Sequence, residues 1–348
     1  MRTIVCKFGG SSTANATQFS RILAILRASP ARRCVVLSAP GTDERHDVKI
    51  TRLLSDCWHW RNDPARRDAL IVAIAARYTE IAAALGLPDM RALVRREVEA
   101  ALSESRDATL SRGEYLCALL FSRYSGIPMI DAAEAITFDE YGDIDHRRTR
   151  ERLSDAFSRA GGRAVLPGFY GADSGGHIRA LPLNGSDITG ALAAAALNAG
   201  LYENWTDVPG LMTADPAIVP EARLIPQVGY RQMRMLARAG ARVLHPACLD
   251  PVAEAGIPTR LRNANDPDSL GTLIDDNVEG MAPCIVGKRL PDGASVITVF
   301  GVDPGKTASA ADALSPSAVS QEDGCCRITL PGGGLAPGMR HLHRRLIA

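Results

Sequence analysis

The sequence is poor in aromatic residues, which make up only 5% of its 348 residues. Hydrophobic residues still account for 46%, so a sizeable core has to be built mainly from Ala, Leu, Val and Ile. A chain of this length exceeds one ordinary domain. It fits one large domain plus a small one, or two domains.

No charge of one sign predominates. The 40 Lys and Arg residues stand against 39 Asp and Glu residues, a formal net charge of +1. This balance provides no general field for a nucleic acid or a membrane surface, so we expect no partner of either kind. Any anion has to be bound at a local site.

Cysteine pairs of the C-x-x-C type are missing, although the chain has eight cysteines. We therefore expect neither a metal cluster nor a disulfide framework, but reduced thiols in a cytoplasmic protein. The N-terminus lacks the pattern of a signal peptide, and no run of about 18 apolar residues predicts a membrane span. A Walker A motif is also missing, because no Gly-Lys-Ser/Thr occurs at the required spacing.

Short apolar segments followed by turn residues predict the strands. Residues 3–6 and 34–38 are rich in β-formers, and residues 18–28 between them have helical apolar spacing. This order predicts a parallel sheet covered by helices. Further helices are expected at 70–85, 90–102, 115–124, 187–199 and 230–239, and further strands at 165–171, 202–208, 259–263, 294–300 and 326–330.

The C-terminal part has a different character. Residues 303–324 are small, polar and proline-containing, and no element is expected there. We interpret the glycines at 332–334 as a flexible turn and the basic segment at 340–345 as a solvated end. Residues 281–348 therefore predict a small α+β appendage.

A lysine and two glycines follow the first strand at residues 7–10 (KFGG). Glycine lets backbone N–H groups approach phosphate oxygens, and lysine supplies a cation. Alone this signal is weak, because Gly-Gly after a strand is usually only a turn.

Six segments in order make the pattern specific. Residues 7–12 (KFGGSS) resemble the N-terminal signature of the aspartate kinase family. The later segments that are similar to this family, in its order, are 37–41 (LSAPG) with 49–51 (KIT), 111–114 (SRGE), 185–189 (GSDIT), 205–210 (WTDVPG) with 214–216, and 240–246 (GARVLHP). The resemblance covers roughly residues 1–276.

The resemblance implies an α/β protein with the amino acid kinase fold, an αβα sandwich with a mainly parallel central sheet. This catalytic domain would span residues 1–280, with an amino-acid lobe at about 1–170 and an ATP lobe at about 171–280. Residues 281–348 would form a truncated ACT-like module. Because this region often pairs in the family, a homodimer is also suggested.

The resemblance further implies an enzyme of amino-acid biosynthesis. It would use ATP and Mg²⁺ to phosphorylate the side-chain carboxylate of L-aspartate, giving 4-phospho-L-aspartate. The carboxylate is already ionised at neutral pH, so no general base is required. Catalysis can then consist of positioning and of neutralising the charge on the transferring phosphoryl group.

Site residues are carried over by position. Lys7 and Asp187 would be catalytic, Lys7 as the neutralising cation and Asp187 as the group that orients it. The expected ATP-binding residues are Lys7, Phe8, Gly9, Gly10, Thr206, Asp207, Met212, Asp215 and Arg242. The expected substrate-binding residues are Ser38, Thr51, Glu114 and Ser186, and no metal-ligating residue is expected.

Each assignment has a structural alternative. Glu114 could be a carboxylate on a helix surface, and Asp187 could be an N-cap. Ser38 and Thr51 could serve local turns and caps. His245 is expected to be packed and hydrogen-bonded, because it has no partners at metal-ligand spacing.

Two departures from the family weaken the case for aspartate itself. Leu183 stands where the family has an arginine that holds a carboxylate of aspartate, and Ala217 stands where it has an arginine near the nucleotide. Either Arg179 or Arg112 substitutes, or the substrate is a related amino acid in a specialised pathway. Alternatively the chain is a non-catalytic regulator that binds ATP or amino acids. A kinase for carbamate, acetylglutamate or a nucleotide fits the segments less well.

Overall fold

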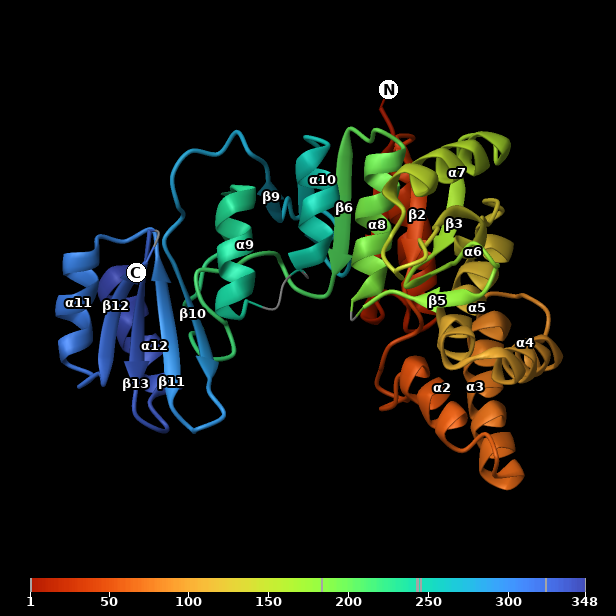
Figure 1. Cartoon of the computed structure of the whole chain (residues 1–348), viewed down its shortest axis with the longest axis horizontal. Coiled ribbons are helices and arrows are strands. Elements are labelled where there is room, and N and C mark those ends of the chain that lie inside the picture. The colour runs from red at the N-terminus through yellow and green to blue at the C-terminus, as the bar shows by residue number, and fades with distance from the viewer. Residues whose placement is uncertain (1, 183, 242–243, 245, 323, 348) are drawn as a thin grey trace. The chain divides into compact units, whose positions relative to one another are not determined.

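The structure is a computed structural model that describes residues 2–182, 184–241, 244, 246–322 and 324–347. It divides into two compact units (Figure 1). Unit 1 comprises Met1–Asp207 and Asn263–Pro267, and unit 2 comprises Val208–Arg262 and Asp268–Ala348.

Unit 1 is built on a parallel sheet with the strand order β3-β2-β1-β6. These strands are β1 (Ile4–Phe8), β2 (Arg32–Leu37), β3 (Ala164–Pro167) and β6 (Leu201–Thr206). A short antiparallel pair, β4 (Tyr170–Ala172) and β5 (Ile178–Ala180), follows β3. Because the four strands are parallel, their carboxyl ends meet at one edge, where open α/β sheets bind ligands.

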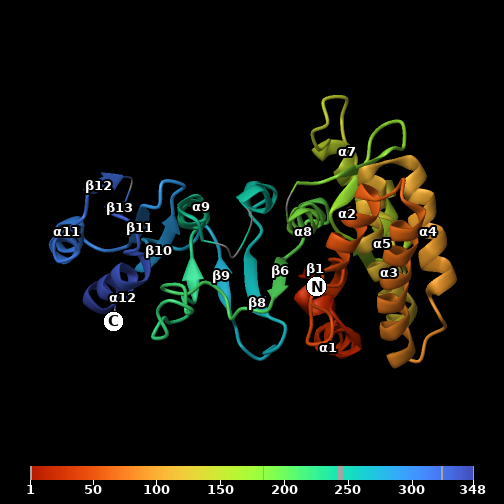
Figure 2. The ribbon, with the colours of Figure 1, turned by 90° about the horizontal axis from the view of Figure 1, so that it is seen from below.

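Helices cover both faces of this sheet (Figure 1, Figure 2). On one face lies α8 (Gly185–Ala196), with α7 (His146–Arg159) packed on it and α6 (Ala132–Ala135) beside α7. The other face carries the larger helical layer. Its helices are α1 (Ala16–Arg27), α2 (Ile50–His59), α3 (Pro64–Ala84), α4 (Arg91–Glu104) and α5 (Arg106–Ser125), and the 3₁₀ turn η1 (Ser11–Thr13) precedes α1.

Strand alternation decides which side chains of β1 meet which layer. Cys6 and Phe8 belong to the core cluster of the larger helical layer. Phe8 stacks on Trp205 of β6, with ring centroids 5.8 Å apart. Because successive side chains point to opposite faces, Lys7 points to the face that α8 covers.

Unit 2 contains two parts. The first has the mixed strands β8 (Thr259–Asn263), β9 (Thr272–Ile274) and β7 (Gln227–Val228), with α9 (Tyr230–Ala239), η2 (Pro246–Cys248) and α10 (Leu249–Glu254). The second has an antiparallel sheet with the order β10-β11-β13-β12. Its elements are β10 (Cys284–Arg289), β11 (Ser295–Phe300), α11 (Pro304–Asp312), β12 (Ala318–Glu322), β13 (Cys325–Leu330) and α12 (Leu335–Leu346).

The expected α/β class with a mainly parallel sheet is confirmed, and several elements are new. Helix α11 and strand β12 lie within the segment where none was expected. The basic end is not simply solvated, because α12 buries Met339, Leu342 and His343. Their helical spacing was obscured by the basic residues Arg340 and His341 between them.

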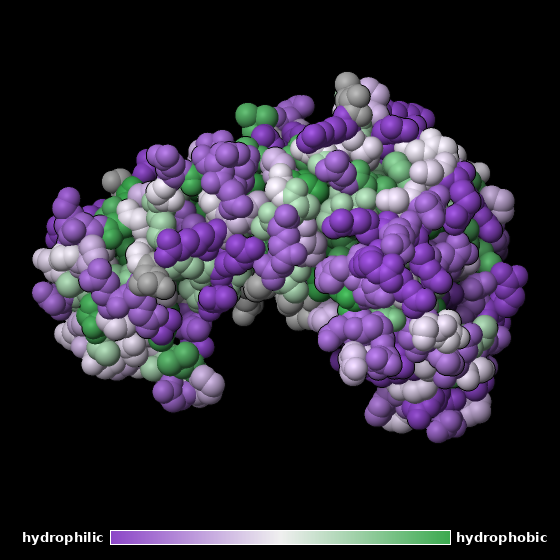
Figure 3. Space-filling model, turned by 45° about the horizontal axis from the view of Figure 1, so that its top comes forward, coloured by the Kyte–Doolittle hydropathy of each residue, from purple (hydrophilic) through white to green (hydrophobic). Residues whose placement is uncertain are grey.

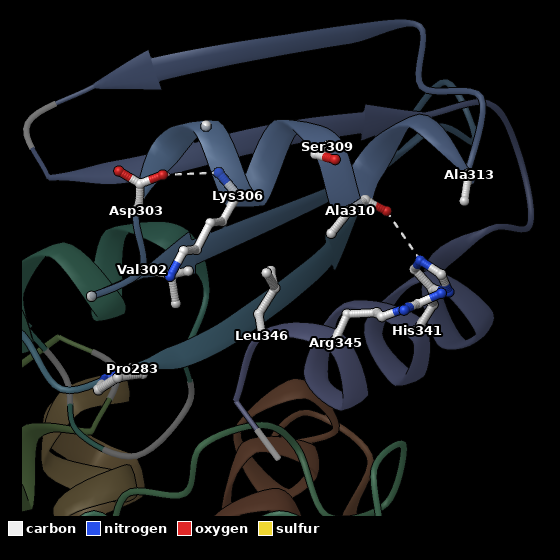
Figure 4. Close-up of a pocket in the computed structure, with 12 residues that line it drawn as sticks. Pro283, Val302, Asp303, Lys306, Ser309, Ala310, Ala313, His341, Arg345 and Leu346 are labelled. Atoms are coloured by element: carbon white, nitrogen blue, oxygen red, sulfur yellow. Dashed lines mark hydrogen bonds between the residues drawn. The ribbon is translucent and has the colours of Figure 1, made fainter.

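A cavity of about 970 Å³ lies in the C-terminal part of unit 2. Figure 4 shows Lys306 of α11 and His341 and Arg345 of α12 around it, and the Nε2 atom of His341 lies 3.0 Å from the carbonyl oxygen of Ala310. None of the expected site residues lines this cavity.

The molecular surface in Figure 3 mixes hydrophilic and hydrophobic residues on the face shown. Among the helices of the described residues, none has the length and apolar character needed to cross a membrane.

A buried ion pair joins two strands of unit 1. The guanidinium of Arg32 donates to both carboxylate oxygens of Glu203, at 2.8 and 3.0 Å, and the Glu203 side chain is only 2% exposed. The indole N–H of Trp205 donates to the same carboxylate at 3.1 Å. Since a buried charge requires its partner, this pair constrains how β2 and β6 flank β1.

We expect Arg32→Ala to lower the free energy of unfolding in urea by about 3–5 kcal/mol, because Glu203 loses its paired cation. The matched control is Arg95→Ala, which removes an exposed pair with Glu99 and should leave stability almost unchanged. Equal losses in both variants would contradict a special role for the buried pair.

Candidate active site

The loop after β1 brings bare backbone to the carboxyl edge of the sheet. We call residues 9–15 the phosphate loop. Its Gly9 N–H donates to the carbonyl oxygen of Trp205 at 3.1 Å. A Cβ atom on Gly10 would lie 3.1 Å from the carbonyl oxygen of Ala39, which is tighter than ordinary contact. A side chain at position 10 would therefore crowd the close approach of this loop to the segment after β2.

Lys7 and Asp187 form the centre of the site. The Lys7 Nζ atom lies 2.7 Å from Oδ1 of Asp187, and the two residues are 8% and 9% exposed. The Asn204 side-chain amide donates to the same carboxylate oxygen at 2.9 Å. Asp187 lies in the first turn of α8, where the helix dipole favours a negative charge. The ammonium is thus held in one place by a carboxylate that is itself held.

Glu114 on α5 is a second buried acid, at 4% exposure. Burial raises the pKa of Glu114 to about 8, against the opposing effects of the Ala39 backbone N–H and the Lys7 charge. Its Oε2 atom has no hydrogen-bond partner among the residues that the structure describes. A buried, unsatisfied carboxyl group is costly, so it indicates a site for a cationic ligand group.

The three predicted substrate hydroxyls lie on different elements of unit 1. Ser38 directly follows β2, and its N–H donates to the carbonyl oxygen of Phe8 at 3.1 Å. Thr51 is in the first turn of α2. Ser186 lies in the first turn of α8 and packs against Gly168. A Cβ atom on Gly168 would lie 2.5 Å from the Oγ atom of Ser186. We call residues 38–49 the substrate loop.

The predicted nucleotide residues are divided between the units. Thr206 ends β6, and its hydroxyl donates to the neighbouring Asp207 carboxylate at 3.2 Å. Met212 and Asp215 belong to unit 2, where Asp215 Oδ1 accepts the Ala217 N–H at 2.9 Å. Three further positions of interest, Leu183, Arg242 and His245, lie outside the described residues.

The two arginines considered as substitutes both have partners. Arg112 donates to Ser111 Oγ at 3.0 Å and lies 3.5 Å from Glu97. Arg179 pairs with Asp173 at 3.2 Å.

A phosphate group would fit the phosphate loop. The buried Ser12 Oγ atom has no hydrogen-bond partner among the described residues. A Cβ atom on Gly9 would lie 3.5 Å from Lys7 Nζ, so glycine leaves the ammonium uncovered on that side. An unpaired hydroxyl, an ammonium group and the exposed backbone at two glycines form a suitable environment for phosphate oxygens. No group of three or more acidic, His or Cys side chains that could hold a metal ion occurs within the described ranges.

Two functional candidates were missed by sequence reasoning. Asn204 supports the Asp187 carboxylate, and its signal was a neutral amide in the middle of strand β6. Arg77 of α3 contacts the phosphate loop, and its signal was a charged residue on the buried face of a helix.

Comparison with known proteins places this chain in a family. A sequence profile described as the amino acid kinase family matches residues 2–263. The chain belongs to the amino acid kinase family. Aspartokinase 3 of Bacillus subtilis is 33% identical over 294 residues, which cover 79% of this chain and 65% of that protein. Lysine-sensitive aspartokinase 3 of Escherichia coli is 31% identical over 301 residues, which cover 79% of this chain and 65% of that protein. This amino acid kinase thus spans slightly less than two thirds of both relatives.

Solved structures support the same assignment. A crystal structure of Clostridium acetobutylicum aspartate kinase has a TM-score of 0.86 at 25% identity, covering 98% of this chain and 99% of that chain. E. coli aspartokinase III in complex with aspartate and ADP has a TM-score of 0.72 at 25% identity, covering 99% and 84%. The amino acid kinase fold and the predicted resemblance to aspartate kinases are therefore confirmed.

The raised pKa of Glu114 predicts a pH-dependent cost to stability. The unfolded side chain ionises near 4.5 and the folded one near 8. Between these values the unfolded chain loses a proton that the folded protein keeps, so stability falls as the pH rises from 4.5 to 8. Glu114→Gln removes this cost.

We therefore expect the unfolding free energy of ligand-free Glu114→Gln to rise relative to the natural protein between pH 5 and 9, by a few kcal/mol. Urea titrations across this range measure the difference. Glu99→Gln, on the exposed face of α4, is the control and should show no such trend. A pH-independent difference for Glu114→Gln would contradict the assignment.

Proposed function

We propose that this amino acid kinase transfers the γ-phosphoryl group of ATP to the side-chain carboxylate of L-aspartate, forming 4-phospho-L-aspartate. The observation that carries the proposal is the buried Lys7–Asp187 pair, 2.7 Å apart, beside the glycines of the phosphate loop. The relatives described above are aspartokinases, and one of the related structures contains aspartate and ADP.

The transfer needs positioning and charge neutralisation more than proton chemistry. A carboxylate oxygen attacks the γ-phosphorus, and the bond from this phosphorus to the β–γ bridging oxygen breaks, releasing ADP. No proton moves, because the attacking carboxylate is already ionised. Lys7 neutralises the charge that spreads over the phosphoryl oxygens. Asp187 and Asn204 keep the ammonium in place during the step.

The amino acid is oriented by the side chains around this ammonium. The Glu114 carboxylate accepts a hydrogen bond from the substrate ammonium, which gives its unpaired Oε2 atom a partner. Ser38, Thr51 and Ser186 donate to the substrate or to the phosphoryl group. These contacts place the carboxylate in line with the scissile bond, where positioning contributes most.

The nucleotide is held by backbone and by few side chains. The Gly10 N–H and the Ser12 hydroxyl donate to phosphate oxygens, and Gly9 leaves the Lys7 ammonium open to them. Thr206 and Asp207 contact the adenosine. Met212, Asp215 and Arg242 complete the set of ATP-binding residues that the sequence predicts. Mg²⁺ would supply further charge neutralisation at the phosphates.

Several broader assignments stay predictions of the sequence. These are the division into a catalytic domain at 1–280 and an ACT-like module at 281–348, a homodimeric assembly, and a cytoplasmic location.

The test is formation of an acyl phosphate, trapped with hydroxylamine, from ATP and a panel of amino acids. We expect aspartate to give the largest kcat/KM. Lys7→Ala should lower kcat by about 10²–10³-fold, because a preorganised cation is lost from the transition state. Lys306→Ala removes an exposed lysine of α11 and serves as the matched control, with unchanged activity.

Three results would redirect the proposal. A related amino acid with a larger kcat/KM than aspartate would replace aspartate as the proposed substrate. The replacement of the family's arginine by Leu183 would then account for the change. Binding of ATP without turnover would favour a regulator. No ATP consumption by the folded protein with any amino acid would reject the kinase assignment.

The raised pKa of Glu114 also predicts that aspartate binding releases a proton. With a pKa of about 8, the carboxyl group is mostly protonated at pH 7 in the free protein. The substrate ammonium lowers this pKa, because it favours the ionised form. Calorimetry at pH 7 in phosphate and Tris buffers should show release approaching one proton, which Glu114→Gln abolishes. Identical binding heats in both buffers for the natural protein would argue against this ammonium site.

A further inference from the structure

Arg77 is a buried arginine that contacts both the phosphate loop and the substrate loop. It lies on α3 between the core residues Ile74 and Ile81, and it is only 4% exposed. Arginine stays protonated in proteins, so this charge remains in the interior and requires acceptors. Its position is explained by what the guanidinium contacts.

The guanidinium joins the phosphate loop to the substrate loop. Its Nη2 atom donates to the carbonyl oxygen of Ala14 at 2.8 Å and to that of Gly41 at 2.7 Å. The carboxylate of Asp43 lies 3.7 Å from the same nitrogen. Ala14 belongs to the phosphate loop, and Gly41 and Asp43 belong to the substrate loop. One side chain therefore binds both loops from the helical layer behind them.

The two loops are also packed against each other and hydrogen-bonded to each other. The Gly41 N–H donates to the carbonyl oxygen of Gly10 at 2.8 Å, and the Thr13 hydroxyl donates to that of Ala39 at 3.2 Å. A Cβ atom on Gly41 would lie 2.6 Å from the Gly10 carbonyl carbon. The Ala39 N–H in turn faces Glu114. The Arg77 contacts thus affect both the phosphate donors and the proposed ammonium site.

A second residue of α3, Glu80, supports the distal part of the substrate loop through His46. Asp43 lies 2.8 Å from Nδ1 of His46, whose Nε2 atom lies 3.3 Å from Glu80. Asn15 of the phosphate loop also donates to Asp43, at 3.2 Å. These groups border a cavity of about 610 Å³ in unit 1, so the loops have open space on one side. Arg77 lines the same cavity, so its guanidinium holds the loops at the wall of this open space.

We infer that Arg77 is a positioning residue for phosphoryl transfer, which keeps the phosphate loop and the substrate loop in one fixed arrangement through the carbonyl groups of Ala14 and Gly41. The inference rests on the proposed function for its effect on catalysis. Its structural part, the joining of two loops, does not depend on that function.

The test compares Arg77→Met, which keeps the side-chain volume but removes all donors, with Arg77→Lys, which keeps one cationic donor group. We expect kcat for acyl phosphate formation to fall about 100-fold in Arg77→Met and about tenfold in Arg77→Lys, because small misplacements of reacting groups are costly. Arg95→Met, on the exposed face of α4, is the matched control and should keep its kcat.

Hydrogen exchange of the ligand-free proteins gives a readout that needs no activity. Exchange should rise in residues 9–15 and 38–43 of Arg77→Met, while β1 and α8 keep the exchange of the natural protein. A kcat within twofold of the natural value would overturn the inference, as would exchange that rises evenly through unit 1. If Arg77→Met fails to fold, Arg77→Lys is judged by the same two measurements.

The outcomes for the two proposals are separable. A natural protein that forms no acyl phosphate refutes the proposed function, and hydrogen exchange alone then decides whether Arg77 joins the loops. An active natural protein with an unaffected Arg77→Met refutes only the inference.

Discussion

The buried ion pair between Lys7 and Asp187 is the interaction on which the site depends. Two charges at less than a tenth exposure are tolerable only when each has a partner. That requirement links β1, which carries Lys7, to the first turn of α8, and Asn204 adds β6 to the same cluster. The sheet order and the start of α8 therefore determine where a phosphoryl group can be neutralised.

Much of the fold could be predicted, because its signals are local. Apolar segments followed by turns predicted the parallel strands, and β1, β2 and β6 lie within a few residues of the expected positions. The positions of two candidate site residues were predictable for a similar reason. Lys7 and Glu114 belong to short motifs whose residue types suit phosphate and ammonium ligands, and both are buried.

The parts that sequence reasoning missed depend on contacts between distant residues. Nothing beside Asn204 in the sequence indicates that its amide supports Asp187, 17 positions away. Arg77 was one cation within an apolar helix pattern, and only the folded chain brings it to Ala14 and Gly41. Helix α12 was hidden because its buried residues are interleaved with basic ones. Such features follow from packing between elements, which local propensity does not encode.

The central claim, that a carboxylate is the nucleophile at the Lys7 site, can be tested with aspartate labelled with ¹⁸O in its side-chain carboxylate. After reaction with ATP, hydroxylamine attacks the acyl carbon and releases phosphate that retains the oxygen once bound to that carbon. Mass spectrometry of the phosphate should therefore show one ¹⁸O atom per molecule formed. Phosphate without the label would show that water attacked the γ-phosphorus, and it would contradict the account.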